Sequence, residues 1–79
     1  MLEFETPSLG ELKLLAFVND VGLIEKKNDE IEKYIVAYGF DMNTKTWRSG
    51  SYHINLEEAE KEFGERIIKE LNTATNETV

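Results

Sequence analysis

The sequence contains no cysteine, one histidine and one proline among its 79 residues. The absence of cysteine excludes disulfide bonds, thiolate ligands to a metal and thiol redox chemistry. With a single histidine, a zinc site would need mostly carboxylate ligands, which is not the usual composition of zinc sites. We therefore expect neither a bound metal nor a cofactor.

Long hydrophobic runs are also missing. The longest apolar stretch is Leu14–Val18, five residues long, whereas a helix needs about 20 apolar residues to cross a bilayer. The first residues, Met1–Glu5, carry acids where a secretory signal carries positive charge, and no apolar segment of signal length follows. We expect a cytoplasmic protein that does not interact with membranes.

Basic residues are few. The sequence has 9 Lys and Arg and 16 Asp and Glu, which gives a formal net charge of −7. This charge favours solubility and opposes the approach of nucleic-acid phosphates. Direct nucleic-acid binding is therefore not expected, whereas a basic protein surface would be attracted. The same charge allows an alternative function, in which the protein mimics nucleic acid and inhibits a DNA- or RNA-binding protein.

The length of the chain is that of a single small domain, residues 1–79, with a modest core. Ser8-Leu9-Gly10-Glu11 has the spacing of a helix capping box, and the apolar residues after it predict a helix over about 9–20. The run from Leu12 to Val18 is also compatible with a buried strand, because periodicity does not separate the two for a short apolar run.

Strands are predicted in the middle of the chain, over 23–26, 31–40 and 46–54. The second is rich in Tyr, Ile and Val, which favour strands. Because the turn-forming residues 41–45 separate it from the third, the two should form an antiparallel hairpin.

A second helix is predicted to begin after Asn55, a good cap that has Glu58 three residues later. Gly64 interrupts this helix, and we expect it to allow close packing on the sheet. Residues 72–79 are polar without periodicity and should form a frayed tail. One stripe of the helix is apolar: Leu56, Ala59, Phe63, Ile67 and Leu71.

The predicted fold class is therefore α+β, a three-stranded antiparallel sheet in the order α-β-β-β-α with both helices packed on one face. The alternative architecture replaces the first helix with a fourth strand over 12–18.

The pairing register of the hairpin decides which side chains share a face. Pairing Phe40 with Thr46 separates an apolar face from a small, polar one, and places Trp47 beside Gly39, where the ring can cover exposed backbone. Pairing Phe40 with Trp47 makes both faces apolar, which a domain this small could hardly cover. We therefore predict the first register.

Two segments have some of the residues that chemistry requires. Asp41–Lys45 begins like a calcium loop but lacks the later ligands, so a plain turn is predicted. Ser49–His53 carries two hydroxyls and an imidazole, but alternate residues on a strand lie about 6.5–7 Å apart, too far for direct proton transfer. We assign no catalytic residue and predict that the protein is not an enzyme; a small enzyme using His53 is the alternative.

The middle of the chain combines basic and aromatic residues that are typical of protein-binding anchors. We predict that the protein acts by binding another protein, and that a homodimer through a strand edge is possible. The candidate protein-binding residues are Lys45, Trp47, Arg48, Tyr38 and His53.

The segments Tyr34–Phe40, Trp47–Tyr52 and Leu56–Ala59 together resemble small acidic proteins of phages and prophages in Gram-positive bacteria. Such proteins are often accessory factors that bind host proteins. The resemblance implies an accessory or regulatory role and assigns no function to a particular residue.

Overall fold

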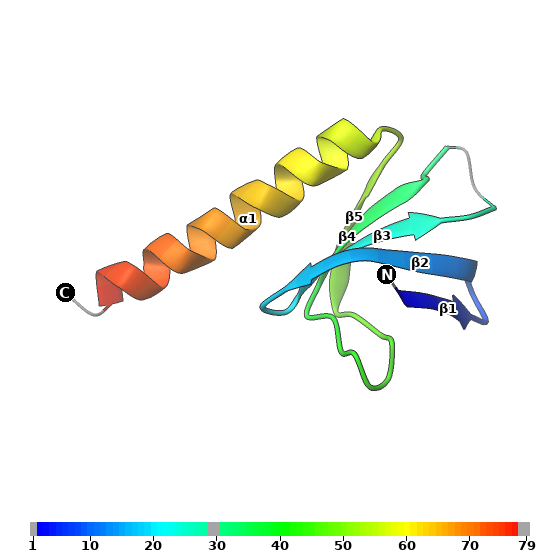
Figure 1. Cartoon of the computed structure of the whole chain (residues 1–79), viewed down its shortest axis with the longest axis horizontal. Coiled ribbons are helices and arrows are strands. Elements are labelled where there is room, and N and C mark those ends of the chain that lie inside the picture. The colour runs from blue at the N-terminus through cyan, green and yellow to red at the C-terminus, as the bar shows by residue number, and fades with distance from the viewer. Residues whose placement is uncertain (1, 29–30, 78–79) are drawn as a thin grey trace.

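The computed structural model of the protein describes residues 2–28 and 31–77, with side chains described through Lys69. Each strand of its antiparallel sheet lies beside its neighbour in the chain, in the order β1-β2-β3-β4-β5. Figure 1 shows a helix that crosses one face of this sheet and continues well beyond it. In chain order the elements are β1 (Leu2–Thr6), β2 (Gly10–Val18), β3 (Val21–Lys26), β4 (Tyr34–Tyr38), β5 (Ser49–His53) and α1 (Leu56–Glu77).

The prediction of a three-stranded sheet with two helices on one face is therefore wrong. The residues expected to form the first helix form β2, which pairs with β1 and β3. The strand proposed as the alternative over 12–18 lies within β2. The predicted strand over 23–26, the antiparallel hairpin of β4 and β5, and the helix after Asn55 are confirmed.

The apparent capping box belongs to the turn that joins β1 and β2. The hydroxyl oxygen of Thr6 accepts a hydrogen bond from the backbone N–H of Leu9, at 3.1 Å. Gly10 then has a φ of +77°, a conformation that glycine adopts at little cost. These contacts close a hairpin at the point where the local pattern favours a helix start.

The apolar run of β2 results from burial on both faces of the sheet. Leu12 and Leu14 belong to the hydrophobic cluster on one face, whereas Leu15 and Ala16 pack against the cluster on the other. Between Leu14 and Ala16 the register shifts by one residue. Such a β-bulge bends the strand and increases the twist of the sheet.

Hydrophobic side chains are buried on both faces of the sheet. On the helix side, Val21, Leu23 and Val36 pack with Ala59 of α1. The opposite side contains the second cluster, and no helix covers it in the described part of the chain. Its buried members are Leu12, Leu14, Ile24, Ile35, Ala37 and Phe40.

Aromatic rings cover this second cluster. Phe40 stacks on Trp47, with ring centroids 6.0 Å apart and an interplanar angle of 28°. Phe4 also contacts Phe40, with a centroid separation of 6.0 Å and tilted rings. Strand β1 and the segment around residues 40–47 therefore take the place of the missing second helix.

The observed hairpin register is the one that was rejected from the sequence. Ile35 pairs with Tyr52 and Ala37 with Gly50, the same register as Phe40 opposite Trp47, so the predicted register is wrong. Both faces are apolar, as expected for that register. The fold accommodates them because α1 covers one face and aromatic side chains cover the other.

The surroundings of the glycines differ from those predicted. At Gly39, whose φ is +70°, Arg48 rather than Trp47 lies over the backbone; the Trp47 ring lies against Gly50. An added Cβ at Gly64 would meet no atom within 4 Å, so close packing on the sheet does not explain this glycine.

Helix α1 extends through Glu77, past Asn72, where the sequence predicts the start of a frayed tail; residues 78–79 lie outside the described residues. Ala59 is fully buried, and Phe63 packs against the helix-side cluster. No helix in the described part of the chain is both long and apolar enough to cross a membrane.

Candidate functional site

The five residues predicted to bind a partner do not form one surface. Lys45 and Trp47 line a cleft on the side of the sheet opposite α1. Tyr38 and His53 lie under α1, where both contact Glu62. Arg48 is exposed and lies 3.7 Å from the carboxylate of Asp20.

The cleft has a volume of about 500 Å³ and lies between β1, the β1–β2 turn, the loop 41–47 and β5. Tyr52, which is 45% exposed, enters the cleft from β5. The predicted register places Tyr52 on the apolar face that the helices cover, whereas in the observed register Tyr52 pairs with Ile35 on the face opposite α1. The register alone does not bring Tyr52 beside Trp47, because Trp47 belongs to the loop before β5 and packs on that same face. The lining residues are Glu5, Thr6, Pro7, Ser8, Thr44, Lys45, Thr46, Trp47 and Tyr52.

The two aromatic residues of the cleft differ in character. Trp47 is half-buried and stacks on Phe40, so it forms a fixed wall. The ring of Tyr52 is more exposed and lies 5.8 Å from the ammonium of Lys26, a buried lysine on the neighbouring surface. Tyr52 is therefore the aromatic side chain most available to a ligand here.

The loop beside the cleft is a closed turn, as the sequence predicted. The carboxylate of Asp41 accepts hydrogen bonds from the backbone N–H of Asn43, at 2.8 Å, and of Thr44, at 3.3 Å. Lys45 adopts a φ of 59°, and its ammonium donates to the carbonyl of Met42. The charged groups of Asp41 and Lys45 therefore both form hydrogen bonds with the backbone of their own loop.

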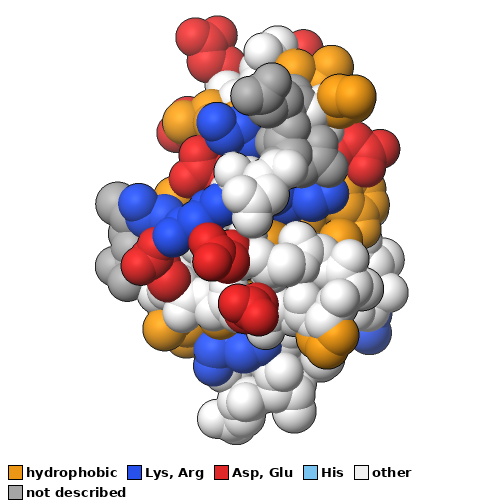
Figure 2. All heavy atoms as spheres, turned by 90° about the vertical axis from the view of Figure 1, so that its right-hand side faces the viewer, with side chains coloured by type: hydrophobic (Ala, Val, Ile, Leu, Met, Phe, Trp, Pro, Cys, Tyr) orange, Lys and Arg blue, Asp and Glu red, His pale blue; other side chains and the backbone are white. Residues whose placement is uncertain are grey.

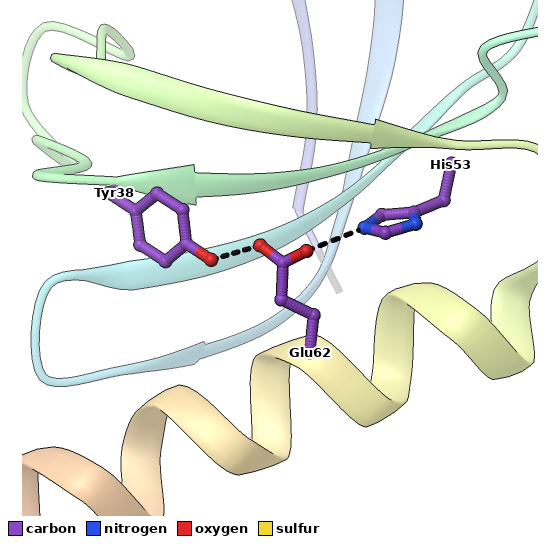
Figure 3. Close-up of polar contacts among 3 residues, drawn as sticks. All are labelled: Tyr38, His53 and Glu62. Atoms are coloured by element: carbon purple, nitrogen blue, oxygen red, sulfur yellow. Dashed lines mark hydrogen bonds and ion pairs between the residues drawn. The ribbon is translucent and has the colours of Figure 1, made fainter.

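A polar cluster of Tyr38, His53 and Glu62 lies between the sheet and the helix (Figure 3). Oε1 of Glu62 is 2.9 Å from Nε2 of His53, and the hydroxyl of Tyr38 donates to Oε2. Glu62 therefore connects α1 with both β4 and β5 at once.

Partial burial raises the pKa of the Glu62 carboxyl, but hydrogen bonds from Tyr38, Ser51 and His53 outweigh that effect, so the pKa lies below its ordinary value of 4.5. Burial and then the neighbouring Glu62 raise the pKa of the Tyr38 hydroxyl above 10.0. The guanidinium of Arg66 lies 4.8 Å from the Tyr38 ring centroid. Ionised Glu62 with neutral Tyr38 is the state that these contacts favour.

Glu62 is a partner of His53 that the sequence analysis did not predict. A signal for it was present, because Glu62 stands between Ala59 and Phe63, on the side of the helix that meets the sheet. Both of its oxygens are engaged by other side chains of the protein. The cluster is suited to holding the helix on the sheet, rather than to proton transfer with a substrate.

Among the described residues, no group of three or more His, Cys, Asp or Glu side chains is arranged to hold a metal ion. No family model, curated protein or solved structure matches this chain. The resemblance to phage and prophage proteins therefore stays a prediction, and function is inferred from the geometry.

Proposed function

We propose that the protein is a non-enzymatic binding protein that holds a segment of a partner protein in the cleft beside Trp47 and Tyr52. The observation that carries this proposal is the exposed Tyr52 ring facing a cleft with a Trp47 wall. A volume of about 500 Å³ lies within the range of roughly 300–1,000 Å³ that is usual for binding sites.

The polar part of the cleft suits the backbone of a peptide. Hydroxyl groups can both donate and accept hydrogen bonds, and rigid aromatic rings provide contact area at a low cost in conformational entropy. The hydroxyl-bearing residues that line the cleft with Tyr52 are Thr6, Ser8, Thr44 and Thr46.

Charge favours a partner segment that carries a basic residue. The protein has a net charge of −7, and Glu5 is in the wall of the cleft. On the face drawn in Figure 2, acidic and basic side chains are interspersed, and hydrophobic side chains form small separate patches. Attraction therefore comes from the overall charge, which raises the rate of encounter with a basic surface.

A protein that acts in this way serves as an accessory or regulatory factor, because occupying a partner's segment changes what else that segment can bind. This role suits the resemblance to small phage and prophage proteins. Catalysis by His53 is not part of the proposal, since Glu62 engages the imidazole within the helix–sheet interface.

The test compares affinity capture by the wild-type protein with capture by two variants. Tyr52→Ala removes the exposed ring of the cleft, whereas Ile68→Ala removes an apolar side chain of α1 that is also exposed and lies outside the cleft. We expect a specific protein to be captured by the wild type and by Ile68→Ala, and its recovery to fall about tenfold with Tyr52→Ala. Equal recovery with both variants would overturn the proposal.

Two further measurements complete the experiment. The fluorescence of Trp47, the single tryptophan, should change when peptides from the captured protein are added, and should not change with unrelated peptides of the same charge. Capture in the presence of heparin separates peptide binding from nucleic-acid mimicry. Recovery that survives heparin supports the peptide-binding cleft, and recovery that heparin abolishes supports mimicry instead.

A further inference from the structure

Strand β5 is an edge of the sheet and lacks the features that normally protect an edge. Its five residues, Ser49–His53, include no Lys, Asp, Glu or Pro. They pair with β4 in an uninterrupted register, without a bulge. Among the described residues, the backbone of β5 is hydrogen-bonded to β4 alone. Such an edge is a template for a further strand.

The opposite edge is protected. Strand β1 carries Glu3 and Glu5, both exposed, and Pro7 follows it in the turn. Charged side chains on an edge strand discourage pairing with another chain. The contrast between the two edges selects β5 as the surface open to strand addition.

We propose that β5 of one copy pairs with β5 of a second copy in antiparallel orientation, about a two-fold axis at Ser51. This inference does not rest on the proposed peptide-binding function. The register places Ser49 opposite His53 of the second copy, and Gly50 opposite Tyr52. In this register, odd-numbered residues of one β5 lie opposite odd-numbered residues of the other, and even opposite even. The side chains that face α1 in each copy therefore stay on the same face of the joined sheet.

The pairing is self-complementary. Each Tyr52 lies directly opposite Gly50 of the other copy, a residue without a side chain against which Trp47 of its own copy already packs, so no two bulky side chains face each other. Directly opposite positions hold no like charges, since β5 has no acidic or lysine side chain. A basic partner segment, by contrast, would find no acidic side chain on β5 with which to pair.

The joined sheet has two consequences for the molecule. Both copies of α1 lie on the same face, because the two-fold axis is perpendicular to the sheet. The two clefts lie on the other face and approach each other, since Tyr52 belongs both to the cleft and to β5. A dimeric protein would therefore present two neighbouring binding clefts.

The dimer must form against the repulsion of two net charges of −7. Salt screens repulsion between exposed charges, with a Debye length of about 10 Å at 0.1 M. Association through a neutral strand edge is therefore expected to strengthen as salt is added. An interface held by ion pairs would weaken under the same change.

The test is sedimentation equilibrium of the whole chain between about 5 and 500 µM, at low and high salt. Ser49→Lys places a charge on the edge, and Asn28→Lys makes the same change of charge in an exposed turn. We expect the wild type and Asn28→Lys to dimerise, and the dissociation constant of Ser49→Lys to rise about tenfold or more. Because both variants reduce the net negative charge equally, weaker association of Ser49→Lys alone locates the interface.

Isotope-filtered NMR on a mixed dimer provides the second measurement. Cross-peaks between Gly50 of one copy and the Tyr52 ring of the other are expected, and they do not depend on a variant folding correctly. A wild-type protein that is monomeric over the whole concentration range would overturn the proposal. So would a dimer that Ser49→Lys leaves intact, or one that lacks these cross-peaks.

Discussion

The carboxylate of Glu62 on α1 lies 2.9 Å from Nε2 of His53 on β5. Its other oxygen accepts a hydrogen bond from Tyr38 on β4. One helical side chain thus joins two strands, next to the apolar contacts of Ala59 and Phe63. The position of α1 depends on a polar contact as well as on hydrophobic packing.

Replacing Glu62 with Gln should destabilise the protein by about 1–2 kcal/mol, since hydrogen bonds to a charged group contribute more than neutral ones. The measurement is urea-induced unfolding followed by circular dichroism. Glu65→Gln, an exposed change on the same helix, serves as the control and should cost under about 0.5 kcal/mol. Equal losses in the two variants would show that the cluster does not hold the helix.

Protonation of Glu62 in acid should lower the free energy of unfolding. The pKa of Glu62 is depressed by its hydrogen-bond donors, so its contribution is present above its unfolded pKa and is lost as the pH falls through the folded value. We expect the free energy of unfolding to decrease below about pH 5, and to decrease less steeply in Glu62→Gln. Glu3→Gln is the control. Lys27 also lowers the pKa of Glu3. Because this ion pair is exposed, the Glu3→Gln variant should lose stability in acid as steeply as the wild type does.

Gly64→Ala should stabilise the protein by about 0.5–1 kcal/mol, because alanine costs less backbone entropy than glycine in a helix interior. The added Cβ would meet no atom within 4 Å. Thermal unfolding provides the measurement, and an increase in Tm is expected. A lower Tm would indicate that Gly64 is needed for a contact with another chain.

Gly39→Ala should have the opposite effect, a loss of about 1–2 kcal/mol, because its φ of +70° is unfavourable for a residue with a Cβ. The new Cβ would also collide with Nε of Arg48. The double variant Gly39→Ala, Arg48→Ala removes that collision and should recover only part of the loss. Full recovery would show that the collision, and not the backbone conformation, causes the destabilisation.

Trp47→Ala should lower the free energy of unfolding by about 2–3 kcal/mol, because the half-buried ring covers Phe40 and part of the second cluster. Tyr52→Ala should cost less, because its ring is more exposed. Denaturant titrations followed by circular dichroism compare the two. A larger loss for Tyr52→Ala would mean that this ring is structural, and that it is unsuitable as the test of partner binding.

The N-terminal half of the fold illustrates how a local pattern can mislead. Ser8-Leu9-Gly10-Glu11 fits a helix cap, and the same residues form a hairpin turn and the start of β2. Leu14–Val18 lacks strand alternation because β2 is covered on both faces. Strand β1 was not predicted at all, although Leu2, Glu3, Phe4 and Glu5 alternate with the period of a strand.

The candidate site was predictable only in part. Lys45 and Trp47 do line the cleft, but Tyr52 joins them because the observed register places it on the face opposite α1, and the loop before β5 turns Trp47 to that same face. His53 was recognised as an isolated imidazole, whereas its partner Glu62 comes from an element that begins after it in the chain. Both omissions concern contacts between elements, which short-range patterns do not encode.

The amino-acid sequence by itself determined the absence of cysteine chemistry, the acidic character, the turn at 41–45, the antiparallel hairpin and the long final helix. Each depends on composition or on residues that are close together in the chain. Only the tertiary structure decided that residues 10–18 form a strand, which register the hairpin adopts and which side chains meet in the cleft. The physical reason is that these outcomes depend on how both faces of the sheet are covered, and distant segments such as α1, β1 and the aromatic residues 40 and 47 provide that cover.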